Sequence, residues 1–200
     1  MTAGEINMVF DGILVSFIIG FFRKGKLDGF VDLKFKYGWV FPLLLAIQLL
    51  VFLNQTNSSL IEAISGYVYI AVYIIGLIFL WLNRGFTGMN LIFIGVLLNF
   101  LVMVLNGGRM PVSLEAVSML DPAAVQILTE GLHAKHTAFT DQTMLGFLGD
   151  IIPLAYPYPI QQVISIGDIL MNIGIFIFIQ KIMMEHPSPE KTSETVEGGV

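Results

Sequence analysis

The stretch that decides the fold is residues 60–82, which read LIEAISGYVYIAVYIIGLIFLWL. A helix needs about 20 consecutive, mostly apolar residues to cross the hydrocarbon core of a bilayer. This stretch is long enough, and it ends at Trp81 with Arg84 close behind, two residue types that favour the interface between lipid and water. It therefore predicts a transmembrane helix.

Four other apolar runs flank this one and have comparable lengths: residues 6–22, 38–53, 89–105 and about 163–184. The shortest of them carries Tyr37 and Trp39 at its start, where aromatic residues anchor a helix in the interface. Hydrophobic residues make up 56% of the 200-residue chain and charged residues 12%, whereas soluble domains are roughly 25% charged. We therefore expect an all-α fold, a single multi-pass bundle of five transmembrane helices over residues 1–184.

Composition excludes several classes of function. The chain has no cysteine, which rules out disulfides, thiolate metal sites and cysteine nucleophiles. Its net charge of −5 argues against a nucleic-acid partner, because such binding needs a basic face. A cleavable signal peptide is not expected, since the N-terminus lacks a basic segment and the first apolar run contains Asp11.

Lysine and arginine predict the orientation, because they accumulate on the cytoplasmic side of membrane proteins. With the N-terminus outside, Arg109 and Lys135 are extracytoplasmic. The other eight of the ten basic residues are then cytoplasmic: Arg23, Lys24, Lys26, Lys34, Lys36, Arg84, Lys181 and Lys191. The opposite orientation reverses this ratio, so we expect the N-terminus outside and the C-terminus inside. The basic loop after the first span should then lie against anionic headgroups.

The last residues, 185–200, differ from the rest of the chain. They contain two prolines, no apolar run and the acidic residues Glu185, Glu190, Glu194 and Glu197. Such a segment buries too little apolar surface to fold. We expect it to be a disordered, acidic cytoplasmic tail.

The segment of residues 106–159 is too polar to span a membrane and too long to be a simple connection. It opens with Asn106, Gly107, Gly108 and Arg109, and a glycine turn that exposes N–H groups beside an arginine can cradle an anion. Ser113 is a candidate cap for one short helix, and Asp121 followed by Pro122 for another. We expect two or three short helices that form a lid on the outer face.

Polar residues of the spans concentrate in their outer halves. At about 1.5 Å per residue, Asp11 lies about 8 Å below the outer end of its span, and Asp168 lies at a similar depth with Asn172 one turn deeper. Gln48 and Asn99 also fall in outer halves, with Arg109 and Asp150 at the membrane boundary. If they converge, they form a polar pocket in which an arginine binds a phosphate or carboxylate and a carboxyl group carries a proton.

Simpler interpretations stay open. Asp11 and Asp168 sit near helix N-termini, where the helix dipole favours an anion without any function. An alternative role for Arg109 is purely structural, namely to tie the lid to Asp150 or Asp168. A double glycine is also common where a chain leaves a helix sharply. His133 and His136 have the spacing of metal ligands on one helical face, but a third ligand is missing. We therefore expect no metal and no cofactor.

Three motifs resemble those of a known family: Asn106-Gly107-Gly108-Arg109-Met110-Pro111-Val112, Leu148-Gly149-Asp150-Ile151-Ile152-Pro153 and Ser165-Ile166-Gly167-Asp168-Ile169-Leu170. This is an uncharacterised bacterial inner-membrane family, catalogued as a domain of unknown function. The resemblance extends over nearly the whole chain except the acidic tail. It implies a multi-pass protein of the bacterial plasma membrane and implies no activity.

Three functions remain. The first is a binder or carrier of an anionic amphiphile or small anion, held by Arg109 and the Gly107-Gly108 turn in a pocket open to the outer leaflet. The second is an intramembrane enzyme with Asp168 or Asp150 as acid or base. The third is a non-catalytic accessory or sensor subunit that contacts a membrane partner protein through the lid or the tail. Membrane lipid is the expected partner in each, and a homo-oligomer is compatible with all three.

Overall fold

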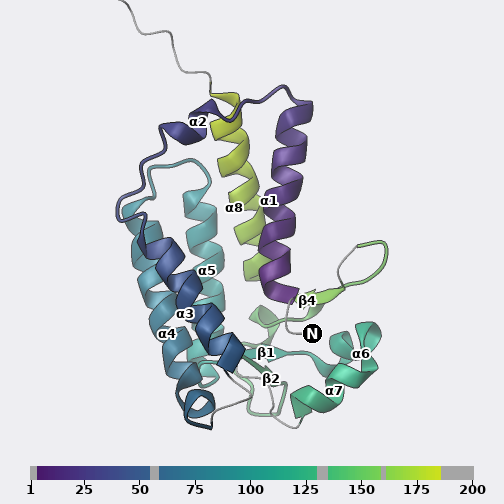
Figure 1. The fold of residues 1–200 in the computed structure, drawn as a ribbon. Helices are drawn as coiled ribbons and strands as arrows, with labels where there is room; N and C mark the ends of the chain where they lie inside the picture. Colours follow the sequence, from purple (N-terminus) through teal and green to yellow (C-terminus); the bar gives the residue numbers. More distant parts are fainter. Residues whose placement is uncertain (1–3, 55–58, 130–134, 159–160, 186–200) are drawn as a thin grey trace, which may run out of the picture.

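The computed structural model describes residues 4–54, 59–129, 135–158 and 161–185, and five long helices dominate it (Figure 1). These helices occupy the five apolar runs: α1 (Gly4–Phe22), α3 (Val40–Asn54), α4 (Ser59–Leu82), α5 (Met89–Leu105) and α8 (Ile166–Met184). The acidic tail beyond residue 185 and His133 lie outside the described residues.

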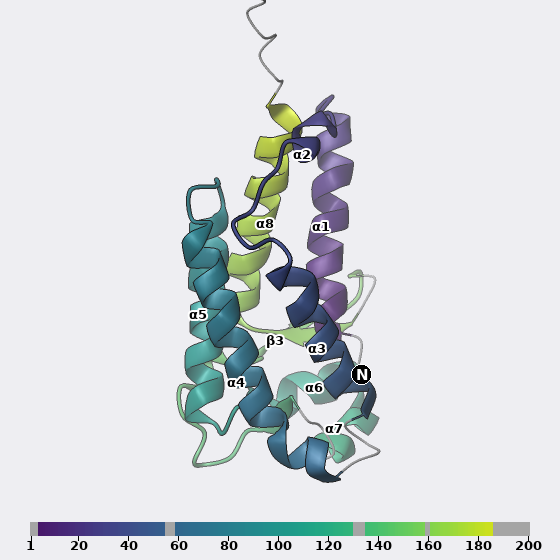
Figure 2. The same ribbon diagram turned by 60° about the vertical axis from the view of Figure 1, so that its left-hand side comes forward.

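The long helices lie side by side in a curved row (Figures 1 and 2). Helix α1 packs on α8, α8 on α5, α5 on α4, and α4 on α3. Their directions alternate, so that α1, α4 and α8 start at the end of the bundle where α3 and α5 finish. We call the described residues of the segment 106–165, at this end, the cap, and residues 23–39, at the other end, the strap.

Helices α5 and α8 make the closest packing in the bundle. A Cβ atom added at Gly95 would collide with the main-chain oxygen of Gly167, and one added at Gly88 would collide with that of Gly174. Small residues let two backbones approach closely, which is the usual packing device of helices in membranes. The α5–α8 pair therefore forms the centre of the row. Its close packing also brings Asn99 of α5 next to Asp168 of α8.

The cap contains two short helices, α6 (Leu114–Leu120) and α7 (Pro122–Thr129), as expected for a lid. The predicted caps are confirmed: Ser113 Oγ accepts from the Ala116 N–H at 3.3 Å, and Asp121 Oδ1 accepts from the Ala123 N–H at 3.0 Å. The two helices bury Val112, Val117, Ala124 and Leu128 between them and the neighbouring strand.

The all-α expectation was incomplete, because the cap also holds four short strands and one 3-10 turn. Strand β1 (Met110–Val112) pairs in parallel with β2 (His136–Ala138), and β3 (Ile152–Leu154) pairs antiparallel with β4 (Gln162–Ile164). The turn η1 (Gly146–Leu148) follows the β2 segment. Strands of three residues are too short to show the alternation by which a strand is recognised in a sequence.

A second apolar cluster joins the cap to the bundle. Met110 and Leu148 from the cap are buried with Tyr69 of α4 and with Val102 and Met103 of α5. The cap is therefore packed on the ends of α4 and α5 through buried apolar side chains. At the opposite end the strap contains only one helical turn, α2 (Asp28–Val31).

Two helices are long and apolar enough to cross a membrane, Ile64–Leu82 and Ile166–Met184. Three shorter apolar helices accompany them: Asp11–Phe22, Val40–Val51 and Met89–Leu105. The chain is thus mostly helical with two candidate membrane spans, and its long helices expose many large apolar side chains.

Candidate functional site

The N-terminus of α8 is capped by a reciprocal pair of hydrogen bonds. The Asp168 N–H donates to Ser165 Oγ at 3.0 Å, and the Ser165 N–H donates to Asp168 Oδ2 at 2.9 Å. This capping box satisfies two N–H groups that a helix start otherwise leaves without partners. Since Ser165 is fully buried, the box fixes the position of the Asp168 carboxylate within the fold.

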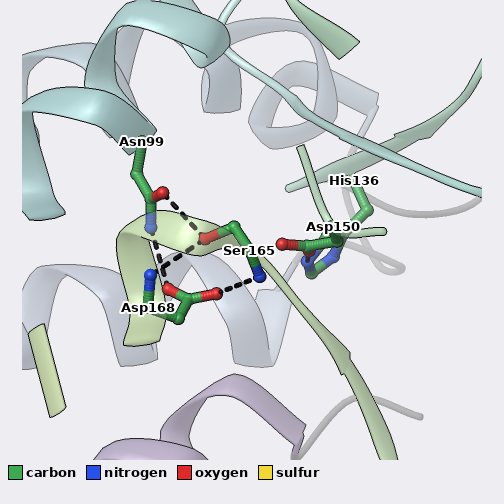
Figure 3. A network of polar contacts seen from close by, with 5 residues as sticks. All are labelled: Asn99, His136, Asp150, Ser165 and Asp168. Carbon is green, nitrogen blue, oxygen red and sulfur yellow. Dashed lines mark hydrogen bonds and ion pairs between the residues drawn. The ribbon is translucent and has the colours of Figure 1, made fainter. Parts of the chain in front are cut away.

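Asn99 of α5 is hydrogen-bonded to both residues of this capping box (Figure 3). Its Nδ2 donates to Asp168 Oδ1 at 2.8 Å, and its Oδ1 accepts from Ser165 Oγ at 2.9 Å. A Cβ at Gly167 would collide with Asn99 Oδ1, so the glycine makes room for the amide. The Asn99, Ser165 and Asp168 side chains therefore form a mutually satisfied group between α5 and α8.

Asp150 lies beside these three side chains, and its main chain is hydrogen-bonded to that of β1 and of the residue after it. The Asp150 N–H donates to the Pro111 oxygen, and the Ser113 N–H donates to the Asp150 oxygen, both at 2.9 Å. The side chain is only 2% exposed, and His136 Nε2 lies 3.5 Å from Oδ2. Oδ1 is buried without a hydrogen-bond partner among the described residues, and the carboxylate points toward Ser165 in Figure 3.

The environment shifts two cap residues in opposite directions. Burial raises the pKa of Asp150, and the charge of Asp168 adds to the rise, while His136 and Lys135 oppose it. Burial lowers the pKa of Lys135, and the charges of Asp168 and Asp150 oppose the fall. Both shifts favour the neutral form. Groups perturbed in this way by burial and by charged neighbours are typical of functional sites.

Three of the predicted site residues, Asn99, Asp150 and Asp168, are therefore neighbours. Asn172 lies one turn further along α8, where its Nδ2 donates to the Asp168 main-chain oxygen at 3.0 Å. Asp11 belongs to a separate contact, in which the Tyr158 hydroxyl donates to its Oδ2 at 3.0 Å.

The Gly107-Gly108 turn is a close contact between backbones. Both glycines have positive φ, and a Cβ at Gly108 would collide with the main chain of Gly66 in α4. The Gly108 N–H donates to the Met103 oxygen at 2.8 Å, and the Arg109 N–H donates to the Asn106 oxygen at 3.4 Å. The turn thus uses these two N–H groups to end α5, and they are not directed at a ligand.

Asn106 holds a neighbouring loop. Its Nδ2 donates to the Met144 oxygen at 2.8 Å, and its Oδ1 accepts from the Met144 N–H at 3.0 Å. The Arg109 side chain is half-buried and makes no hydrogen bond or ion pair with any residue that the structure describes. Within those residues, it is not tied to Asp11, Asp150 or Asp168.

Sequence reasoning missed four members of the cluster: Tyr73, Lys135, His136 and Ser165. The spacing of Ser165 and Asp168 is a capping-box pattern that was available from the sequence. Lys135 and His136 reach Asp150 through the β1–β2 pairing, which sets Met110 opposite His136. Tyr73 of α4 faces Asn99 and lies within reach of both carboxylate charges. No group of three potential metal-ligating side chains occurs within the described residues.

Comparisons with known proteins assign the chain to a family. Residues 32–180 match the family described as a family of unknown function, DUF5317. An uncharacterized protein of Thermotoga maritima is 43% identical over 102 residues, which is 51% of this chain and 55% of that protein. The match therefore spans about half the length of that relative. No solved structure matches the chain.

Proposed function

The chain belongs to the DUF5317 family, whose function is unknown, and we propose that it is a multi-pass membrane protein that binds an anionic amphiphile at its outer face. Arg109 holds the anionic headgroup in this proposal. The membrane is the bacterial plasma membrane, and all five long helices cross it with the N-terminus and the cap outside.

The topology is supported by the surface of the helices. Large apolar side chains are exposed on α1, α3, α4 and α5, for example Leu14, Leu50, Ile78 and Ile94. Exposed apolar surface of this extent is unfavourable in water and favourable in lipid. The alternating directions leave the N-terminus and the cap at one end, while the basic strap lies at the other. The positive residues favour the cytoplasm for the strap.

The observation that carries the binding proposal is that Arg109 has a fixed backbone and a side chain without a partner among the described residues. Its backbone is fixed, because the neighbouring Met110 N–H donates to the Lys135 oxygen at 2.7 Å and Gly108 packs against Gly66. Arg109 is nevertheless half-buried as a residue, and its guanidinium has no hydrogen-bond or ion-pair partner among the described residues. A planar cation held in place at a membrane boundary suits the bidentate binding of phosphate or carboxylate.

An apolar surface leads from this arginine along α5. Ile94, Leu101 and Leu105 are each more than 40% exposed, and their spacing places them on the same side of the helix. An alkyl chain lying along this side reaches the turn that carries Arg109. In this proposal the headgroup binds Arg109 and the tail lies along the exposed side of α5.

The test compares Arg109→Ala with Arg84→Ala, because Arg84 lies at the opposite end against the Trp81 ring. Delipidated protein is titrated with phosphatidylglycerol and with phosphatidylcholine, and bound lipid is counted by native mass spectrometry. A charge-assisted hydrogen bond contributes about 1.5–3 kcal/mol, so Arg109→Ala should lose about tenfold or more in affinity for phosphatidylglycerol alone. Equal losses in both variants, or none, would contradict the proposal.

A second function is favoured by one separate observation, the buried Oδ1 of Asp150 beside His136. In this alternative Asp150 is a general acid, and Asp168, occupied in its capping box, only positions the helix. Infrared spectra at neutral pH should show a protonated carboxyl band that Asp150→Asn removes and Asp168→Asn retains. A wild-type spectrum without such a band would exclude this role.

A further inference from the structure

The strap is held to the bundle along one side by buried contacts. The Lys26 N–H donates to the Met183 oxygen at 2.9 Å, and Gly29 lies so close to Ile182 that a Cβ there would crowd its main chain. The Phe30 ring lies 5.5 Å from that of Phe17. The connection between α1 and α3 is therefore an ordered element with a defined outer side.

A buried amide fixes the second half of the strap. Asn83, directly after the end of α4, accepts from the Lys36 N–H at 2.8 Å and donates to the Lys36 oxygen at 3.0 Å. Beside it the Phe35 ring lies among Phe79, Phe86 and Phe178, with ring centroids 5.1–5.9 Å apart. These contacts use the main chain and one aromatic ring and leave the lysine side chains outside.

The outer side of the strap is basic. Lys24, Lys26, Lys34 and Lys36 are exposed, and their side chains make no hydrogen bond or ion pair within the part of the chain that the structure describes. Arg23 is also exposed, although its Nη1 donates to Gln180 Oε1 at 2.8 Å. The acids of the strap are Asp28 and Asp32, so its net charge is positive.

Large apolar side chains are exposed among these lysines. Phe22 and Val31 are each 84% exposed, Trp39 is 64% exposed and Tyr37 is 62% exposed. Tryptophan and tyrosine favour the level of the lipid headgroups, where one end of the ring is apolar and the other is wet. Lysine stems cover apolar surface while their ammonium groups reach outward.

From this combination we propose that the strap is a docking surface for anionic phospholipid headgroups in the leaflet at its end of the bundle. Lys24, Lys26, Lys34 and Lys36 contact the phosphates, while Val31 and Trp39 enter the interface. Charge complementarity selects anionic over zwitterionic lipid. The surface lies at the end opposite Arg109 and does not depend on the ligand proposed there.

The two tryptophans of the chain, Trp39 and Trp81, allow a direct test. In a Trp81→Phe background Trp39 reports alone on its lipid neighbours. The full chain is reconstituted into vesicles of phosphatidylcholine with a minor fraction of phosphatidylglycerol, and bromine is placed on one lipid at a time. Trp39 should be quenched by brominated phosphatidylglycerol several times more than its mole fraction predicts.

Charge variants decide whether the strap causes this preference. Each lysine near an anionic surface contributes roughly fivefold in binding, so replacing all four with glutamine should abolish the preference, and replacing all four with arginine should retain it. High salt should reduce it, because screening shortens the range of these charges. Since all four side chains are exposed, circular dichroism should show unchanged folding. Quenching in proportion to mole fraction in the wild type, or a preference that survives the glutamine variant, would overturn the proposal.

Discussion

The two ends of the bundle both use a buried asparagine to join a loop to a helix, yet they differ in what remains without a partner. At the strap end, Asn83 binds the main chain of Lys36 through both atoms of its amide. Gln180 is similarly occupied, since its Nε2 donates to the Ser16 oxygen at 2.6 Å and its Oε1 accepts from Arg23. The buried amides of this end are satisfied.

At the cap end the Asn99 amide is also hydrogen-bonded through both its oxygen and its nitrogen. Other buried polar atoms nearby, however, have no hydrogen-bond partner in the part of the chain that the structure describes. Within the described residues, the buried side-chain polar atoms without a partner are Asp150 Oδ1, both polar atoms of Gln162, and Asn172 Oδ1. All belong to the cap or to the adjacent half of α8. Because such atoms cost stability, their concentration at the cap end distinguishes it from the strap end, where the buried amides of Asn83 and Gln180 are hydrogen-bonded.

The largest expected effect concerns the turn that starts the cap. Gly108→Ala introduces a Cβ that collides with Gly66 at a positive φ, so it should lower the free energy of unfolding by about 2–5 kcal/mol. Gly107→Ala has the same kind of φ but no atom within 4 Å of the added Cβ, so its cost should be only about 1 kcal/mol. Unfolding in detergent, titrated with sodium dodecyl sulfate, measures both. Equal effects would show that the contact with α4 is unimportant.

The next effect compares the two asparagines directly. Asn99→Ala leaves buried Ser165 and the Asp168 carboxylate without their amide partner, and should cost about 2–4 kcal/mol. Asn83→Ala frees the Lys36 main chain, which water can reach, and should cost about 1–2 kcal/mol. The same unfolding titration gives both values. A larger loss at Asn83 would reverse the comparison between the two ends.

A smaller effect tests Asp150 through pH. Because its pKa is raised in the folded protein, folded Asp150 keeps a proton above about pH 4, where the unfolded chain has lost it. The stability it contributes is therefore full at low pH and is lost as pH rises through the folded pKa. Asp150→Asn cannot ionise, so its free energy of unfolding relative to wild type should increase as pH rises from about 4 through the folded pKa of Asp150, and should then level off.

Unfolding titrations at several pH values measure this difference, and the same change at an exposed position of the cap, Asp141→Asn, is the matched control. A difference that is independent of pH would mean that Asp150 ionises as readily in the folded protein as in the unfolded chain.

The main elements of the fold were predictable because they depend on composition and local signals. Apolar runs of sufficient length gave the five helices, and Ser113 and Asp121 gave two helix starts. Depth arguments also placed Asn99 and Asp168 at one level, where the structure joins them. The helix starts need only the spacing of residues along one helix, and the common level of Asn99 and Asp168 needs only their depth within two expected spans.

The rest depends on contacts between distant segments. His136 reaches Asp150 only because β1 pairs with β2 in a particular register, and strands this short carry no pattern. The lack of an ion pair between Arg109 and the carboxylates of the described residues also depends on the path of the chain after Gly108. That path is set by the packing against Gly66, which lies about forty residues earlier in the sequence.

The smallest expected effect probes the edge of the cap, at the contact between Tyr158 and Asp11. Tyr158→Phe removes one hydroxyl that donates to a partly exposed carboxylate, and water can replace it, so the loss should be about 0.5–1 kcal/mol. Asp11→Asn keeps an acceptor for the hydroxyl and should cost less than Tyr158→Phe. Unfolding titrations of the two variants and their double variant give the coupling between the side chains. A coupling above that of the Asn99 and Asp168 pair would place the main polar anchor of the cap at α1 instead of α8.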